Sequence, residues 1–280
     1  MLELVRDGAH GLQIDKLCAG SKLDFNPLNT SKPDVALCEN LVEAVGRLLK
    51  KCREINPEFC IAAEAVQDRL IPYVDVFYRN SRGNDIAPLR YVFPEWTSCQ
   101  HISAPADFRG VNGAVLTGSA ICLEPFMYQG PLSHPLYTRL AEYIQEVERI
   151  RGDLIDIIFL GSYFDTQHAR VTVLDGTKTD NPLRARQIGG EVMIPDGGGK
   201  SSAESSSKLL FRVHGHLETN QRAMVVVNQS DEDIEYRWEF LHKKVAKATL
   251  YQPFAQQQTV LNEHSLRIKG EGLHVLVESE

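Results

Sequence analysis

Acidic residues close two short apolar runs in the first half of the chain. Asp15 ends the run in "GLQID", and Glu64 ends the run in "EFCIAAE". A pair of carboxyl groups can hydrolyse a glycosidic bond, one acting as an acid and the other as a nucleophile or base. Each residue also has a structural alternative. Asp15 can cap the following loop, and Glu64 can form an ion pair with Arg69 or Arg90.

The spacing of parallel strands suits such a pair. Neighbouring strands lie about 4.8 Å apart, and the two carboxyls of a retaining glycosidase lie roughly 5–5.5 Å apart. Lys16 and Arg69 carry positive charges that would favour ionisation of a nearby carboxylate. If Asp15 and Glu64 end consecutive strands of one sheet, they are therefore the predicted catalytic residues.

Other polar and aromatic residues near these strand ends are candidates for binding a substrate. Asp68 is either a helix cap or an acceptor for a sugar hydroxyl, and Trp96 is either a core residue or a ring that stacks on a sugar. The predicted substrate-binding residues are Lys16, Asp68, Tyr78, Arg90, Glu95 and Trp96.

The elements that would position these residues alternate between strands and helices. Short apolar runs predict strands at 11–17, 58–64, 74–78 and 89–96. Amphipathic or glycine-containing patterns predict helices at 33–56, 107–123 and 134–154. This alternation is typical of parallel βα units. We count about four units where a closed (β/α)8 barrel has eight, so residues 1–165 are predicted to be the C-terminal half of a TIM-type barrel.

The second part of the chain has a different pattern. From residue 166 to 280, strand-like runs alternate with turn residues, which predicts an antiparallel β-sandwich. The predicted fold class is therefore α/β plus all-β: a partial barrel followed by a sandwich. The Gly/Ser-rich segment 195–208 is predicted to be a flexible loop. Its "GGGKSS" lacks the spacing and the following helix of a phosphate-binding loop.

Composition argues against several classes of protein. The chain has 280 residues and a net charge of −7, which disfavours nucleic-acid binding. No run reaches the roughly 18 apolar residues of a membrane span. The N-terminus shows no signal-peptide pattern, so a cytoplasmic location is the default expectation. The six cysteines include no CxxC pair and are predicted to be free thiols.

The sequence predicts neither a metal nor a cofactor. His214 and His216 in "HGH" fall on one face of a predicted strand, but no third ligand is evident. No GxSxG elbow marks a serine nucleophile. No glycine fingerprint follows a strand, which argues against a nucleotide-dependent enzyme.

Four segments together carry a resemblance to a known family: "GLQIDKL", "AAEAVQDRLIPYVDVFY", "LRYVFPEW" and "GSAICLEPF". Over most of its length the chain resembles the C-terminal part of an uncharacterised bacterial family of glycoside-hydrolase-like (β/α)8 barrels with a C-terminal β-sandwich. The resemblance implies an enzyme that acts on an oligosaccharide or polysaccharide, with Asp15 and Glu64 at the catalytic face. The chain departs from this pattern by lacking the front half of the barrel. The alternative is a non-catalytic carbohydrate-binding or structural protein in which the all-β part binds the sugar. Its candidate aromatic residues are Tyr236, Trp238, Tyr251 and Phe254. Alternation puts Tyr236 and Trp238 on one face, either as a binding platform or as core residues.

Overall fold

The structure is a computed structural model. It describes residues 1–15, 23–28, 31–64, 68–78, 88–94, 96–102, 104–123, 133–174 and 209–279. The chain forms two compact units. The first unit comprises Met1–Arg82, Trp96–Ile102 and Ser119–Glu124, and the second comprises Gly83–Glu95, Ser103–Gly118 and Pro125–Glu280.

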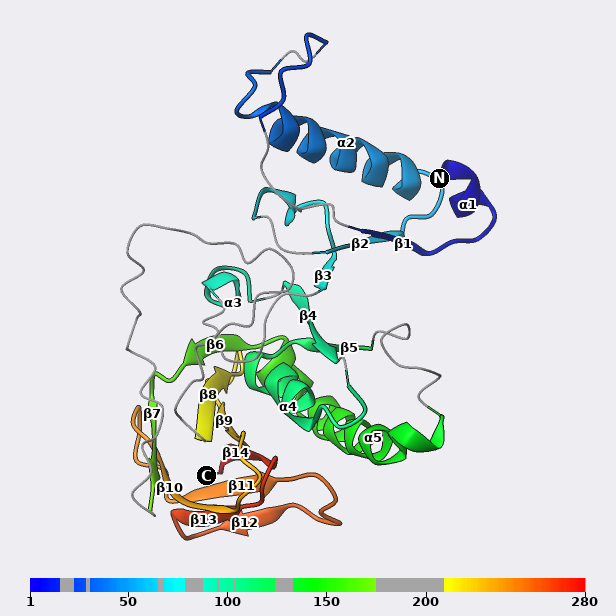
Figure 1. Ribbon diagram of the computed structural model, residues 1–280. Helices are drawn as coiled ribbons and strands as arrows, with labels where there is room; N and C mark the ends of the chain where they lie inside the picture. The colour runs from blue at the N-terminus through cyan, green and yellow to red at the C-terminus, as the bar shows by residue number, and fades with distance from the viewer. Residues whose placement is uncertain are drawn as a thin grey trace. The chain divides into compact units, whose positions relative to one another are not determined.

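The first unit is built on a five-stranded parallel sheet whose order follows the chain, β1-β2-β3-β4-β5. Figure 1 shows these strands together with helices α1 and α2. The elements are α1 (Leu2–Arg6), β1 (Gly11–Ile14), α2 (Ala36–Arg53), β2 (Cys60–Glu64), the 3₁₀ turn η1 (Asp68–Leu70), β3 (Val76–Tyr78), β4 (Thr97–Ile102) and β5 (Ala120–Leu123). Parallel strands joined by helical crossovers confirm the α/β character predicted for this part of the chain.

The end of α2 is tied to the start of two strands. Arg53 donates from Nε to the carbonyl of Phe59 at 3.1 Å and from Nη2 to Asp75 Oδ1 at 2.8 Å. The other oxygen of Asp75 accepts the backbone N–H of Ile61 at 2.8 Å. Asp75 precedes β3 and therefore lies at the amino end of the sheet, where it has a structural role.

The sheet has two unlike faces. In β2, Ile61 and Ala63 are buried, whereas Cys60 is exposed and Glu64 is half-buried. The same alternation continues in β4, where Ser98, Gln100 and Ile102 are buried. Successive side chains of a strand point to opposite faces. One face of this sheet is thus buried, and the other is more open.

Two predicted elements differ from the structure. The predicted strand 89–96 contains a helix, α3 (Pro88–Val92), in the second unit, and the strand begins only at Thr97. A proline suits the first turn of a helix, and short apolar runs do not separate helix from strand. The predicted helix 107–123 ends early. Its N-cap Asp107 accepts the N–H of Gly110 at 2.9 Å, and α4 (Phe108–Thr117) stops at Gly118, whose φ is 66°.

The second unit contains two antiparallel sheets and the helices that pack on them (Figure 1). The strands are β6 (Ser162–Asp165), β7 (Ala169–Val173), β8 (Leu209–Gly215), β9 (Arg222–Asn228), β10 (Ile234–Phe240), β11 (Lys247–Tyr251), β12 (Thr259–Leu261), β13 (Ser265–Ile268) and β14 (Leu273–Ser279). The orders are β13-β10-β7 and β12-β11-β14-β9-β8-β6. Besides α3 and α4, the helices are η2 (Pro135–Tyr137), α5 (Thr138–Asp153) and the π-helical turn η3 (Ile155–Phe159). The antiparallel content predicted for this part is confirmed.

One apolar core is shared by residues from both sheets, among them Val171, Phe211, Val226, Trp238 and Leu276. On their other side, β8 and β9 contact α4 and η3. These two strands are therefore buried along almost their whole length, which explains their nearly continuous apolar sequence.

The two compact units do not follow the predicted boundary at residue 165. Helices α4 and α5 precede this residue but group with the antiparallel sheets. Asn112 on α4 donates to the carbonyl of Glu271 at 2.8 Å, across the predicted boundary. This grouping reflects packing, and the boundary between folding domains stays a prediction. The predicted loop 195–208 lies outside the described residues. None of the helices in the described ranges is long and apolar enough to cross a membrane.

Candidate functional site

Asp15 and Glu64 lie at the carboxyl edge of the parallel sheet. In the β1–β2 pair, Ile14 is opposite Ala63. Asp15 directly follows Ile14, the last residue of β1, and Glu64 is the last residue of β2. The two residues thus stand at the ends of neighbouring parallel strands. Asp15 is exposed and Glu64 is half-buried, so both are on the accessible side of this edge.

Tyr78 extends this row to the third strand. It is the last residue of β3 and is opposite Glu64 in the ladder. Paired residues in parallel strands point to the same face. The row therefore holds two carboxyl groups and a phenol, of which Tyr78 is only 7% exposed. Carboxyl groups supply acid–base or nucleophilic chemistry, and a nearby phenol can donate a hydrogen bond to a substrate.

His101 is a residue of this face that the sequence analysis missed. It lies near the carboxyl end of β4, opposite Cys122 of β5. Its place in the alternation of β4 puts it on the half-open face, together with Thr97 and Cys99. The segment 97–102, TSCQHI, has no alternation of apolar and polar residues, because Ser98 and Gln100 are on its buried side. The sequence therefore carried little signal for a strand here, and the predicted strand ended at residue 96.

The cations near Glu64 in the sequence have other partners. Arg69 forms a bidentate ion pair with Glu39 on α2. The hydrogen bond from Arg69 is the main reason that the pKa of Glu39 is lowered. Asp68 is exposed, begins η1, and accepts the backbone N–H of Arg69 at 2.8 Å. This is a contact with the next residue and not with the N2 or N3 amide that a helix cap would bind.

Two predicted substrate-binding residues occupy buried positions. Trp96 is 8% exposed, precedes the amino end of β4, and packs on Phe77 with ring centroids 5.4 Å apart. Arg90 belongs to the second unit, is 1% exposed, and donates to the carbonyls of Pro94 and Phe159. Trp96 is not at the carboxyl edge, because it lies at the opposite end of its strand. The side chain of Arg90 is occupied by backbone carbonyls of its own unit. Lys16 and Glu95 lie outside the described residues.

The aromatic platform expected from the alternative function is not formed by Tyr236 and Trp238. Both side chains are fully buried in the core of the second unit. The hydroxyl of Tyr236 lies 2.9 Å from Nδ1 of His274. Alternation did place the two residues on one face of β10, but this face is covered by the other sheet.

The two histidines of "HGH" bind different parts of the backbone. Nε2 of the fully buried His214 lies 3.1 Å from the carbonyl of Leu116 on α4. Burial is the main cause that lowers the pKa of His214 to about 3. Nδ1 of His216 accepts the backbone N–H of Glu218 at 3.1 Å. In the described part of the chain, no group of three or more His, Cys, Asp or Glu residues is arranged to hold a metal.

Comparison with solved structures identifies enzymes of similar fold. Isomaltulose synthase from Klebsiella sp. LX3 matches with a TM-score of 0.54 and 9% identity, over 99% of this chain and 66% of the enzyme. The α-amylase from H. orenii matches with a TM-score of 0.53 and 10% identity, over 99% and 62%. Amy13B from Eubacterium rectale matches with a TM-score of 0.52 and 8% identity, over 99% and 61%.

Sequence comparisons add no family. No family model matches the chain, and no curated protein matches it. The chain spans between about three fifths and two thirds of the length of the three enzymes named above. At identities of 8 to 10%, the likeness concerns the fold alone. This chain therefore shares the α/β-plus-antiparallel-sheet fold of the corresponding parts of α-amylase-type glycoside hydrolases.

Proposed function

We propose that this chain carries the carboxylate pair of a glycoside hydrolase or a related sugar-transferring enzyme. The observation that supports the proposal is the register of β1 and β2, which pairs Ile14 with Ala63, so that the residues that follow them, Asp15 and Glu64, stand at the carboxyl ends of neighbouring strands. In barrels of parallel strands, the carboxyl ends are where active sites form. The proposed substrate is an oligosaccharide or polysaccharide.

In the proposed mechanism, Glu64 is the general acid/base and Asp15 is the nucleophile or second carboxylate. Glu64 first gives a proton to the glycosidic oxygen as the bond to the leaving group breaks. Asp15 stabilises the positive charge that develops on the sugar, either by forming a covalent bond or through a water that it activates. Tyr78 lies beside Glu64 in the ladder and would bind the substrate or orient the acid. Asp68 and the undescribed Lys16 and Glu95 remain substrate-binding candidates.

The α-amylase and the isomaltulose synthase guide the choice of the first substrate. Their names denote enzymes of sugar chemistry, so α-linked glucans are the first compounds to test. We also propose that strands outside these 280 residues cover the open face of the parallel sheet and complete a barrel. These strands would come from the same polypeptide or from a partner.

The test replaces each carboxyl by its amide in the protein as the cell makes it. We expect Glu64→Gln and Asp15→Asn each to lower kcat by at least about a thousandfold, since each removes a group that acts in the transition state. The melting temperature should stay unchanged. Glu43→Gln is the matched control, because Glu43 is an exposed carboxylate on α2 with only a loose contact to Arg47 at 3.6 Å. Turnover near that of the unaltered protein in both site variants would exclude the proposed pair.

Rescue with azide assigns the two roles if the enzyme retains anomeric configuration. Azide can replace the missing group in Glu64→Ala or Asp15→Ala. If Glu64 is the acid/base, Glu64→Ala gives a glycosyl azide of retained configuration, because azide attacks the intermediate. Asp15→Ala then gives the inverted product, because azide attacks the substrate directly. The opposite pattern would exchange the assignments.

A further inference from the structure

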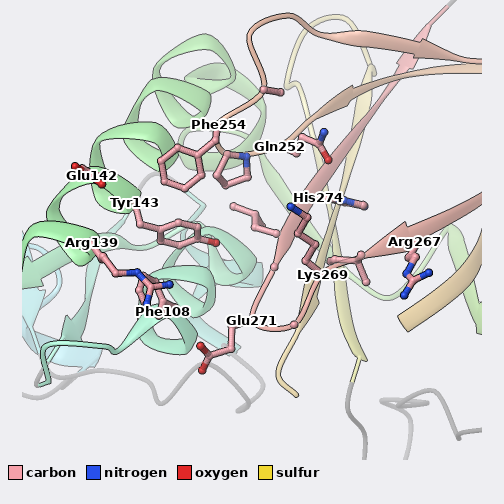
Figure 2. Close-up of a pocket in the computed structure, with 16 residues that line it drawn as sticks. Phe108, Arg139, Glu142, Tyr143, Gln252, Phe254, Arg267, Lys269, Glu271 and His274 are labelled. Atoms are coloured by element: carbon pink, nitrogen blue, oxygen red, sulfur yellow. The ribbon is translucent and has the colours of Figure 1, made fainter. Parts of the chain in front are cut away.

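A pocket of about 550 Å³ lies within the second unit, between its helices and its antiparallel strands (Figure 2). One wall comes from the start of α4 and the first turns of α5. The other comes from the segment after β11 and from the turn between β13 and β14. This volume is in the range of pockets that bind small molecules. The carboxylate pair belongs to the first unit, so this pocket is a separate feature of the chain.

The most unusual residue of the pocket is Phe254. Its side chain is 61% exposed, and its φ of 63° is in the left-handed region. The left-handed conformation destabilises a residue with a side chain by about 1–2 kcal/mol. A phenyl ring that stays exposed offsets little of this cost, because little of its apolar surface is buried. The backbone N–H of Phe254 donates to Glu146 on α5 at 3.1 Å. The chain thus holds an apolar ring in solvent by means of a specific contact, which points to a binding role.

Other aromatic rings adjoin Phe254. Its centroid is 6.1 Å from that of Tyr143, and Tyr143 packs edge-on against Phe108 at 5.2 Å. Figure 2 shows Phe254 and Tyr143 close together on the helix side of the pocket. The hydroxyl of Tyr143 donates to Asn112 at 2.5 Å, and the amide of Asn112 donates to the carbonyl of Glu271. The aromatic wall is therefore fixed to the opposite wall by two hydrogen bonds.

Polar groups line the rest of the pocket without a strong excess of either charge. The cationic members are Arg139, Arg267 and Lys269, and the anionic members are Glu142 and Glu271. Arg267 is paired with Asp233 at 3.1 Å, and Glu271 lies 3.3 Å from Arg109. This balance suits a neutral ligand that has many hydroxyl groups better than a strongly charged one.

We propose that this pocket is a second, non-catalytic site for a short oligosaccharide, with a sugar ring stacked on Phe254. A sugar combines an apolar face with a rim of hydroxyls, and the pocket offers exposed aromatic surface beside side-chain amide, carboxylate and guanidinium groups. Gln252, Glu142 and Arg139 would bind the hydroxyls. The choice of a glycan as the ligand rests on the proposed function. The existence of the pocket does not, because the pocket is formed by residues of the second unit.

The experiment measures binding of maltotetraose and of cellotetraose by calorimetry in the Glu64→Gln background, which removes the proposed turnover. We expect saturable binding of at least one of these sugars. Phe254→Gly should raise the Kd at least about tenfold, while its backbone becomes less strained. Phe254→Tyr keeps a ring and should keep the Kd within about twofold. Leu217→Ala is the control, because Leu217 is 60% exposed in the same unit but does not line the pocket.

Two results would overturn the inference. One is binding that Phe254→Gly leaves unchanged, because the sugar would then bind elsewhere. The other is a lack of heat with both sugars, whether or not hydrolytic activity depends on Glu64. Conversely, binding that depends on Phe254 in a protein with no such activity would support the pocket and reject the catalytic proposal.

Discussion

The two units bury their strands in different ways. In the first unit, β2 and β4 alternate between buried and more exposed residues. In the second unit, β8 is buried at every position, and β9 is buried at every position after Arg222. The antiparallel strands have the other sheet on one side and α4 with η3 on the other. The parallel strands have one well-buried face and one where Cys60 is exposed and Glu64 is half-buried.

This difference separates a closed region from a more open one. Sheets of parallel strands are usually covered on both faces, so a half-open face is exceptional for such a sheet. The catalytic role proposed for Glu64 requires that a substrate can reach this residue, and Glu64 is half-buried on the more open face. The buried polar residues of the second unit, such as His214, instead bind the backbone inside a closed structure.

The comparison predicts that a substitution in the core of the second unit lowers the free energy of unfolding far more than a substitution on the open face of the first unit. Trp238→Ala should lower the free energy of unfolding by about 3–5 kcal/mol, because a fully buried indole leaves a cavity. Cys60→Ser should change it by less than about 0.5 kcal/mol, since Cys60 is exposed. Urea unfolding followed by circular dichroism measures both. Both variants are made in the isolated 280-residue chain, which lacks the covering strands proposed above, so equal losses there would contradict the comparison.

A second prediction concerns Gly118, which ends the helix that covers β8 and β9. Its φ is 66°, and an added Cβ would lie 2.4 Å from the carbonyl oxygen of Ile158. Gly118→Ala should therefore lower the free energy of unfolding by about 2 kcal/mol or more. Gly152→Ala is the matched control, because nothing lies within 4 Å of its added Cβ and alanine favours the helix by about 0.5–1 kcal/mol. Thermal or urea unfolding measures the stability of both variants. A similar loss of stability in Gly118→Ala and Gly152→Ala would contradict this account.

A third prediction uses pH to probe the closed interior of the second unit. Burial lowers the pKa of His274 from 6.5 to about 4. The unfolded chain then binds a proton that the folded chain does not, so stability is full above pH 6.5 and falls as pH decreases towards 4. The slope for one such histidine approaches about 1.4 kcal/mol per pH unit. His274→Asn should reduce the slope of unfolding free energy against pH by up to this amount, and an unchanged slope would contradict the prediction.

The sequence predicted elements whose signals are local. The apolar face of α2, the short apolar run of β2 and the alternation in β10 were sufficient to locate those elements within a few residues. The short strands β12 and β13 were not predicted, because three or four residues carry too little pattern. The helix α3 was predicted as a strand for the same reason.

The site was predictable only in part. Asp15 and Glu64 could be found because each follows an apolar run that predicts a strand. Neighbouring parallel strands end at the same edge of a sheet, so residues at their ends are expected to lie near one another. The position of Arg90 depends on a hydrogen bond to Phe159, which is distant in the sequence. The position of Trp96 depends on packing against Phe77, a contact that the sequence pattern leaves ambiguous. The pocket around Phe254 combines segments more than 100 residues apart, as its contact with Glu146 shows. Spacing along the chain could not predict it.

Gly11, at the start of β1, limits which sequence changes this chain can accept. A Cβ at this position would lie 2.6 Å from Sγ of Cys60 on β2. The thiol of Cys60 is exposed and can rotate away, whereas its carbonyl oxygen, 3.2 Å from the added Cβ, is part of the backbone. An alanine at position 11 would therefore first displace the thiol of the neighbouring strand. The absence of a side chain at Gly11 is what leaves room for that thiol between the first two strands.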